Sequence, residues 1–297
     1  MSLPGPERGD AGAPEGADRG GGVLPRTPGS ADARNFLTDN PELYQAQFPD
    51  PGHLAAGWVD EIGRRFGGGR TLLDLGCGTG RDAGYLAGIG YAVTGLDSSV
   101  AMLEHAGKAH PAATFVHGDL REFELDTRFA IITCLDSALL YCHTNAELAG
   151  FLRHCARHLT PGGLLIAEMR NGAFFLGSTE LLDTPGTRAL TWDGNTYHSH
   201  TTLRIDHTAQ LLRRSRIWAL PDGTALHQES AWRLLFPQEL RYFLDVAGFD
   251  VLALFDGPGP RTDPVWEPGA APSADAASGD RLHLVARLRA AAPEGEA

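Results

Sequence analysis

Apolar and polar positions along residues 71–169 alternate in a way that predicts strands separated by helices. Short apolar runs indicate buried strands, and between most of them the apolar positions recur every three or four residues, as in an amphipathic helix. The predicted strands are TLLDLG (71–76), YAVTGLD (91–97), ATFVHGD (113–119), FAIITCL (129–135) and LLIAEM (164–169). The predicted helices are 81–90, 99–110 and 145–163, the last with Asn145 as its candidate N-cap. This alternation predicts a parallel doubly wound sheet with right-handed crossovers.

The pattern changes in the second half of the chain. Four β-like runs lie between Thr187 and Phe236, separated by WDGN, DHTAQ and PDGT. Because Asp-Gly pairs favour hairpin turns, these runs predict an antiparallel β meander. A helix at 237–249 and strands at 250–255 and 281–288 follow. The predicted fold class is therefore α/β, a Rossmann-like doubly wound sheet of seven strands with an inserted meander that acts as a lid.

Composition suggests where the folded core begins and ends. Residues 1–34, 257–279 and 290–297 are rich in Gly, Pro, Ala and acidic residues, and segments with so little apolar content are predicted to be disordered. Trp266 is an exception in the second segment, because a side chain of this size could dock on something. The predicted organisation is an α/β core over 35–186, the insertion over 187–236 and the end of the core over 237–289.

Charge and cysteine content narrow the class of protein. The 297 residues carry a formal net charge of −12, and the best basic cluster, Arg213, Arg214 and Arg216, is too short for a nucleic-acid interface. No apolar stretch reaches the roughly 18–20 residues of a membrane span, and the N-terminus lacks the apolar run of a secretory signal. The four cysteines form no CxxC pair. We expect a reduced cytoplasmic protein that binds neither nucleic acid nor membrane.

The stretch LLDLGCGTGRD (72–82) places three glycines directly after the first predicted strand. A dinucleotide fingerprint, G-x-G-x-x-G, would need glycine where Arg81 stands, and a P-loop would need a lysine that the loop lacks. Both phosphate-binding interpretations fail, which also weighs against a nicotinamide-dependent oxidoreductase. Three acids accompany the first three strands: Asp74 lies on the first strand just before the loop, Asp97 ends the second, and Asp119 follows the third. Asp97 alone could cap a helix and Asp119 alone could serve a turn.

Taken together, the segments 72–81, 93–103, 115–120 and 159–169 resemble the motifs of class I S-adenosylmethionine-dependent methyltransferases, in order and spacing. The cofactor of that family carries a sulfonium, an ammonium and a ribose diol but no phosphate. By the family's pattern, Asp97 would accept hydrogen bonds from the diol, while Gly76 and Gly78 let the backbone approach the cofactor closely. The resemblance implies that the other cofactor-binding residues are Asp74, Gly80, Ser98, Met102, Asp119 and Leu120, with Ser98, Met102, Asp119 and Leu120 around the adenine.

Within that family, the chain is similar to the aminosugar N,N-dimethyltransferases of actinomycete secondary metabolism. The shared features are CLDSALLY (134–141), the antiparallel insertion and RLLFPQELRYFLDVAGFDV (233–251). The resemblance implies methyl transfer to an amine of a small natural-product acceptor, such as an amino sugar. O-methylation and a non-catalytic binding module on the same fold remain alternatives, and a homodimer is one option that the sequence leaves open.

Candidate acceptor-site residues follow the fourth and fifth strands, because ligands of doubly wound sheets bind beyond the carboxyl ends of the strands. His143 is the first choice for a general base, although a loop histidine in solvent is the alternative. Asp136 could hold an acceptor amine or cap a turn, and Tyr44 is expected on an N-terminal helix over the cofactor. His198 and His200 share one strand face, which could line the pocket or face solvent. The remaining substrate-site candidates are Tyr141, Glu168 and Arg170. No metal is predicted, because His154 and His158 lack a third ligand and their helix is expected to face solvent there.

Overall fold

The computed structural model describes residues 36–177, 180, 182, 184–273 and 277–290. All of them belong to one compact unit, Arg34–Ala297. Residues 1–34 and most of the tail at 290–297, both predicted to be disordered, lie outside the described residues. Among the described helices, none combines the length and the apolar character that a membrane crossing requires.

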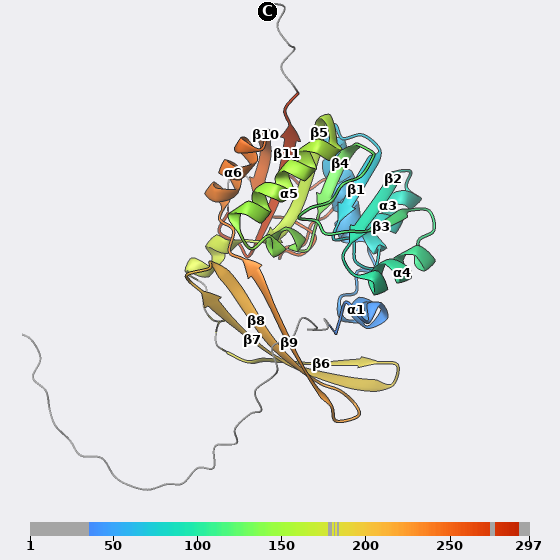
Figure 1. The fold of residues 1–297 in the computed structure, drawn as a ribbon, viewed down its shortest axis with the longest axis vertical. Coiled ribbons are helices and arrows are strands. Elements are labelled where there is room, and N and C mark those ends of the chain that lie inside the picture. Colours follow the sequence, from blue (N-terminus) through green and yellow to red (C-terminus); the bar gives the residue numbers. More distant parts are fainter. Residues whose placement is uncertain (1–35, 178–179, 181, 183, 274–276, 291–297) are drawn as a thin grey trace, which may run out of the picture. The chain divides into compact units, whose positions relative to one another are not determined.

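The larger sheet has seven strands in the order β10-β11-β5-β4-β1-β2-β3 (Figure 1). Its strands are parallel except for β11, which is antiparallel to both of its neighbours. The chain crosses in opposite directions from the central pair of β1 and β4, so this pair is the switch point beyond which ligands bind in such sheets. The strands are β1 (Thr71–Leu75), β2 (Ala92–Asp97), β3 (Thr114–His117), β4 (Phe129–Cys134), β5 (Leu159–Arg170), β10 (Phe249–Phe255) and β11 (Arg281–Leu288).

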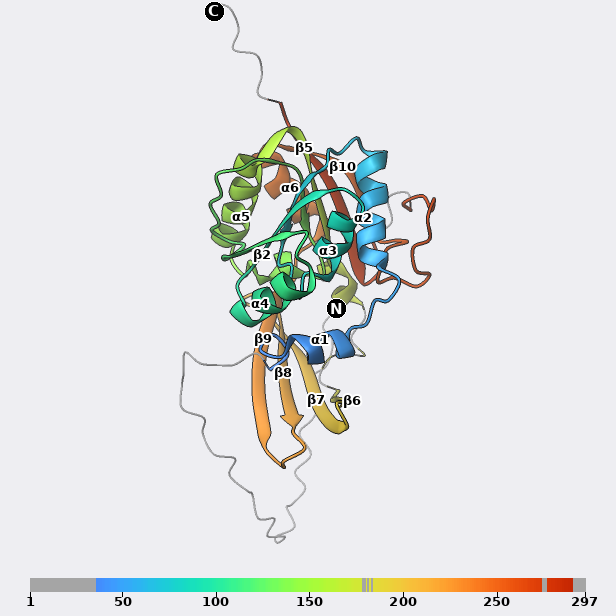
Figure 2. The same cartoon turned by 90° about the vertical axis from the view of Figure 1, so that its right-hand side faces the viewer.

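Helices cover both faces of this sheet (Figure 2). On one face, α5 and α6 bury Phe151 and Leu240 in a cluster with the apolar residues of the strands. On the other, α2 and α3 bury Trp58 and Leu86 in a second cluster. The helices are α1 (Pro41–Gln47), α2 (Leu54–Arg65), α3 (Arg81–Gly88), α4 (Val100–Ala109), α5 (Asn145–His158) and α6 (Pro237–Val246), with short 3₁₀ turns η1 (Ala138–Tyr141) and η2 (Gly172–Leu176).

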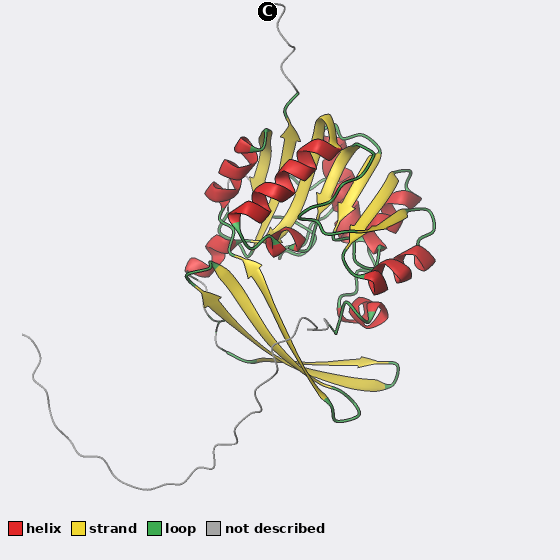
Figure 3. Cartoon of the chain, in the orientation of Figure 1, coloured by secondary structure: helices red, strands yellow, loops and turns green. Residues whose placement is uncertain are grey.

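The smaller sheet is a separate antiparallel meander in the order β6-β7-β8-β9, visible below the main sheet in Figure 3. Asp193 and Gly194 turn between its first two strands with φ of 47° and 72°, the left-handed pair that a tight hairpin needs. The predicted fold class, including the inserted meander, is confirmed. Its strands are β6 (Gly186–Trp192), β7 (Asn195–Asp206), β8 (Leu211–Ala219) and β9 (Ala225–Arg233).

Two local predictions were wrong. The Gly/Pro-rich segment 257–279 was predicted to be disordered, but its described part is anchored to the core: Trp266 is 6% exposed within the α2 cluster, and the Gly269 N–H donates to Glu61 at 2.9 Å. Asn145 was predicted to cap the fifth helix. Thr144 is the cap instead, in a capping box with Glu147.

Candidate active site

The glycine loop connects β1 to α3 and is tied to the neighbouring strand. The backbone N–H groups of Gly76 and Cys77 both donate to the Leu96 carbonyl, at 2.8 and 3.1 Å. Gly76, Gly78 and Gly80 all have positive φ, between 54° and 76°. At Gly78 an added Cβ would meet no atom within 4 Å, so this glycine is required by its left-handed backbone rather than by crowding.

Asp97 ends β2 and faces the glycine loop. Its Oδ2 accepts the Gly78 N–H and its Oδ1 accepts the Ser99 N–H, each at 2.8 Å. A carboxylate oxygen can accept more than one hydrogen bond. The side chain therefore fixes the loop and can still accept hydrogen bonds from hydroxyl groups of a ligand.

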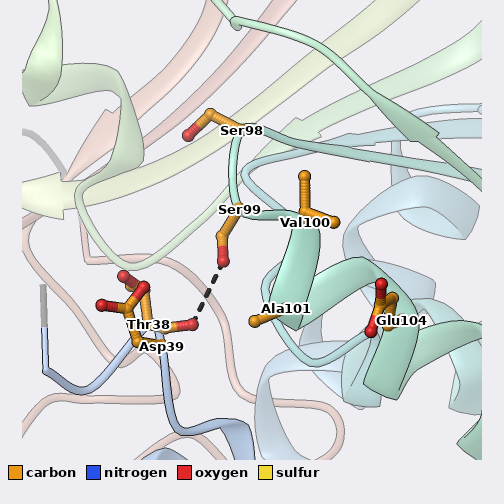
Figure 4. Close-up of a pocket in the computed structure, with 7 residues that line it drawn as sticks. All are labelled: Thr38, Asp39, Ser98, Ser99, Val100, Ala101 and Glu104. Atoms are coloured by element: carbon orange, nitrogen blue, oxygen red, sulfur yellow. Dashed lines mark hydrogen bonds between the residues drawn. The ribbon is translucent and has the colours of Figure 1, made fainter. Parts of the chain in front are cut away.

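Each of the two backbone groups that Asp97 accepts belongs to the lining of a different pocket, Gly78 to one and Ser99 to the other. One is lined by the predicted residues Tyr44, Asp74, Gly76, Gly78 and Asp136, together with Cys77, Thr79, Arg81, Asp82, Leu135 and Arg261; we call it the loop pocket. The other lies over the start of α4, where the side chains of Ser99 and Ala101 point toward Thr38 and Asp39 and Val100 points away from them (Figure 4). We call this one the α4 pocket; Ser98, Ser99 and Glu104 complete its lining.

The α4 pocket agrees only partly with the residues predicted around an adenine. Ser98 lines it, but Met102 is 1% exposed in the core, and Val100, 57% exposed, supplies the apolar wall instead. Asp119 is held by Arg121, whose Nε donates to both carboxylate oxygens at 2.9 and 3.0 Å. These bonds lower the pKa of Asp119. Leu120 is half-buried and packs against the core.

Asp74 is a buried acid at the floor of the loop pocket. It is 5% exposed, and its Oδ1 accepts the Thr133 hydroxyl at 2.7 Å. Desolvation raises its pKa to about 7, and the nearby Asp82 and Asp97 carboxylates add to the shift, while the Thr133 hydrogen bond opposes it. A positively charged ligand group in the pocket would favour the ionised form of Asp74.

The segment after β4 presents Asp136 to the loop pocket through a strained turn. Asp136 and Ser137 both have positive φ, 47° and 67°, a conformation that non-glycine residues adopt at a cost. The turn is held because the Asp136 N–H donates to Glu168 Oε2 and the Ser137 N–H donates to the Glu168 carbonyl, both at 3.0 Å. The Asp136 side chain stays 43% exposed.

Glu168 was predicted to bind substrate, but in the structure it is buried and binds two arginines instead. It is fully buried, and its two oxygens accept Arg261 at 2.7 Å and Arg281 at 2.9 Å. Both guanidinium groups also approach Asp136, at 3.5 and 3.7 Å. Glu168 therefore positions the arginines and the Asp136 turn rather than contacting a ligand. Arg170, half-buried at the end of β5, supports the same turn through its N–H to the Ser137 hydroxyl.

The candidate base His143 joins the core to the meander. Its Nε2 lies 2.9 Å from the Ala231 carbonyl of β9. Because a carbonyl accepts only, Nε2 carries the proton in this contact, and Nδ1 is the ring nitrogen left to accept. Tyr141, two residues earlier, accepts a hydrogen bond from Trp232 of the same strand. Both side chains therefore lie where the two sheets meet.

Three histidine predictions need correction or comment. His198 and His200 are exposed on β7 while Ser199 between them is 3% exposed, so the histidines lie on the outer face, not toward the pocket. His158 was expected to face solvent, yet it is 2% exposed: its Nε2 accepts the Leu125 N–H and its Nδ1 contacts the His154 carbonyl.

Within the described ranges, no group of three or more His, Cys, Asp or Glu side chains could hold a metal ion.

The donor set around Asp97 fits the cofactor that the motifs imply. Asp97 could accept a ribose diol, Val100 and Ala101 offer an apolar wall for an adenine, and Asp74 lies in the loop pocket, where a cationic group would balance its charge. A phosphate would instead meet several carboxylates here and be repelled. Sequence reasoning missed Arg261, because it lies in a segment with the composition of a disordered loop, and Val100, because the family pattern pointed to Met102.

A seven-stranded sheet of this order, with a glycine loop and an acid at the end of β2, defines an S-adenosylmethionine-dependent methyltransferase of class I. Comparison with known proteins agrees. A family model for a methyltransferase domain matches residues 72–163. The chain is 31% identical, over 209 residues, to a dTDP-3-amino-3,6-dideoxy-alpha-D-glucopyranose N,N-dimethyltransferase of Streptomyces fradiae, covering 67% of this chain and 78% of that relative. This chain therefore belongs to the family of S-adenosylmethionine-dependent methyltransferases, and its methyl donor is S-adenosylmethionine.

Two further relatives extend the comparison. The Cypemycin N-terminal methyltransferase of a Streptomyces species is 29% identical over 205 residues, covering 68% of this chain and 80% of that relative. Among solved structures, a sugar N-methyltransferase from Streptoalloteichus sp ATCC 53650 superposes with a TM-score of 0.66 at 23% identity, covering 90% of this chain and 97% of the other. At that identity the superposition establishes the fold alone.

Proposed function

We propose that this enzyme methylates the amine of a small natural-product acceptor, an amino sugar that carries a nucleoside diphosphate. The relative from Streptomyces fradiae acts, by its name, on an amino sugar linked to dTDP. The observation that carries the proposal to this chain is a group of arginines on the inner face of the meander.

The inner face is the side of the meander that packs against the segment around α1. On β8 it carries Arg214, Arg216 and Trp218, which share a face because they alternate along the strand. Trp218 is 1% exposed and packs with Leu37 and Leu43 of that segment. Arg188 of β6 joins them across the sheet, since it pairs with Ser199, which pairs with Trp218.

These arginines have no carboxylate within salt-bridge distance among the described residues. The Arg214 guanidinium lies 4.7 Å over the Trp232 ring, and its Nε is buried without a hydrogen-bond partner. Arg216 donates through Nε to the Thr201 hydroxyl at 2.8 Å. Burial, together with the neighbouring Arg214 and Arg188 cations, lowers the pKa of Arg216 to about 10.

Such a group of cations is costly unless an anion compensates it. Arginine binds phosphate groups through paired hydrogen bonds, so a diphosphate is the ligand that the cluster suits. Its place supports this: Arg214 lies over the ring of Trp232, and the neighbouring Ala231 carbonyl contacts His143 in the segment that follows β4 and carries Asp136. The cluster would therefore hold the nucleotide while the sugar reaches toward the loop pocket.

Bound S-adenosylmethionine supplies an activated methyl group on a cationic sulfur. The protein's task is to orient the acceptor amine in its neutral form, exclude water and receive the proton that is lost. Asp136, exposed in the loop pocket, is placed to accept hydrogen bonds from that amine and to take up its proton. Tyr44 stays neutral because burial raises the pKa of its phenol, so it can act as a hydrogen-bond donor.

The proposal is tested by transfer of labelled methyl groups to dTDP-3-amino-3,6-dideoxyglucose and to the same amino sugar without the nucleotide. We expect the enzyme to methylate the dTDP-linked amino sugar with a KM about tenfold to a hundredfold lower than its KM for the free amino sugar. Arg214→Gln and Arg216→Gln should raise the KM for the nucleotide form and leave that for the free sugar unchanged.

Arg213→Gln is the matched control, because Arg213 lies on the opposite face of β8 and bonds Asp206 at 2.7 Å. It should change neither KM. Failure of the wild-type enzyme to methylate any amine would contradict the proposed function. Equal use of both sugars would contradict the nucleotide part alone.

A further inference from the structure

Arg261 belongs to the segment between β10 and β11, far in sequence from the cofactor motifs, yet it lines the loop pocket. The segment is held in place locally. The Gly259 N–H donates to the Thr262 hydroxyl at 2.7 Å, and the Trp266 N–H donates to the Gly259 carbonyl at 2.9 Å. Because Trp266 is buried against α2, Arg261 is presented from an anchored loop rather than from a free one.

The contacts of Arg261 use only part of its guanidinium. Nη1 donates to Glu168 at 2.7 Å and Nε lies 3.5 Å from Asp136, which leaves Nη2 without an acceptor among the described residues. Arg281 balances the charge of this network, because it binds the second oxygen of Glu168. Arg261 is therefore held in a fixed orientation with donor capacity remaining.

Arg81 is the other guanidinium in the pocket lining, and it is occupied differently. Its Nη1 donates to the Phe48 carbonyl at 2.9 Å and its Nε lies 3.3 Å from Asp82. These contacts tie the segment after α1 to the glycine loop. Arg81 also keeps Nη2 without an acceptor among the described residues, but its role is to hold the glycine loop, whereas the contacts of Arg261 tie no part of that loop. We therefore assign an anionic group of a ligand to Arg261.

The methionine end of the cofactor carries an ammonium and a carboxylate on one carbon. The loop pocket offers Asp74 to the ammonium, and a guanidinium with a free edge matches a carboxylate. We propose that Arg261 binds this carboxylate, so that the segment 257–279 is part of the cofactor site. The inference rests on the assignment of S-adenosylmethionine as methyl donor and not on the identity of the acceptor.

Decarboxylated S-adenosylmethionine isolates the interaction, because it keeps the sulfonium, the amine and the nucleoside but lacks the carboxylate. Isothermal titration should show that the wild-type enzyme binds S-adenosylmethionine at least about tenfold more tightly than the decarboxylated form. In Arg261→Gln the affinity for S-adenosylmethionine should fall about tenfold or more, while that for the decarboxylated form changes less than about twofold. Arg261→Lys keeps the positive charge, so this variant should still bind S-adenosylmethionine more tightly than the decarboxylated form, although by a smaller factor than the wild-type enzyme.

Arg281→Gln is the control, because Arg281 binds the same Glu168 without lining the pocket. It should change both affinities by the same factor. Thermal unfolding without ligand checks that each variant is folded. Equal losses for both ligands in Arg261→Gln, or no preference in the wild-type enzyme, would overturn the inference. A wild-type enzyme that binds neither ligand would instead contradict the cofactor assignment.

Discussion

The Gly78 N–H donates to Oδ2 of Asp97 at 2.8 Å. One carboxylate at the end of β2 thus fixes the conformation of the glycine loop after β1 and faces the place where a ribose diol would bind. The same side chain caps the start of the next turn through the Ser99 N–H. Loop geometry and cofactor recognition are therefore coupled through a single residue.

Asp97→Ala should lower the affinity for S-adenosylmethionine about a hundredfold, because it removes the diol acceptor and releases two backbone donors. Asp97→Asn keeps one carbonyl oxygen as an acceptor, so its affinity for S-adenosylmethionine should fall less than that of Asp97→Ala. Isothermal titration measures both, and circular dichroism checks that the sheet is intact. Unchanged affinity in the alanine variant would show that the diol is bound elsewhere.

Asp74 makes stability depend on pH. Its pKa is about 7 in the folded protein, raised from 3.8 by desolvation. Between those values the unfolded chain has lost the proton that the folded chain keeps, so this group's contribution to stability is complete below about pH 4 and declines as the pH rises to 7. The loss amounts to at most about 4 kcal/mol.

Asp74→Asn removes this titration and keeps an oxygen for the Thr133 hydroxyl. Denaturant unfolding should therefore give the variant and the wild-type enzyme similar stability near pH 4. By pH 8 the variant should be more stable, by roughly 1 to 4 kcal/mol. A difference that is constant with pH would mean that Asp74 does not titrate in this range.

The alternation of apolar runs was sufficient to predict the seven-stranded sheet, because a strand buried on both faces must be apolar throughout. The last strand was predicted at residues 281–288, where β11 lies. The meander followed from Asp-Gly turns such as Asp193-Gly194, whose left-handed backbone those residues tolerate. In the site, the family's motifs predicted Asp97 and Gly78 as parts of one cofactor site, and the structure brings the two residues into contact.

What the sequence could not provide were contacts made across the fold. Nothing near Glu168 in the chain indicates that Arg261 and Arg281 will surround it, since they are about a hundred residues away. The composition of 257–279 predicted disorder; Trp266 was the exception that could dock, and the sequence could not show that this one contact orders the segment around it. The face on which His198 and His200 lie depends on strand register, which pattern alone left open.

Thr144 illustrates the same limit at a helix end, because either it or Asn145 could have been the cap. Its side chain accepts the Glu147 N–H at 3.2 Å, and Glu147 returns a bond to the Thr144 N–H at 2.8 Å. Thr144→Ala should therefore lower the free energy of unfolding by about 1 kcal/mol. Thr144→Ser keeps the hydroxyl and should lower the free energy of unfolding much less. Equal decreases in the two variants would show that the capping hydrogen bond is not the cause.

Asp136 and His143 were both predicted to act in catalysis, and their contacts now separate them. Asp136 is exposed in the loop pocket, whereas the Nε2 of His143 is engaged by the Ala231 carbonyl of β9. If Asp136 holds the acceptor amine, Asp136→Asn should lower kcat about a hundredfold. His143→Gln retains an N–H that can reach Ala231 and should leave kcat within about threefold, because the variant loses only a titratable ring. The opposite ranking of the two variants in steady-state assays, or loss of the kcat pH profile in His143→Gln, would return the role of general base to His143.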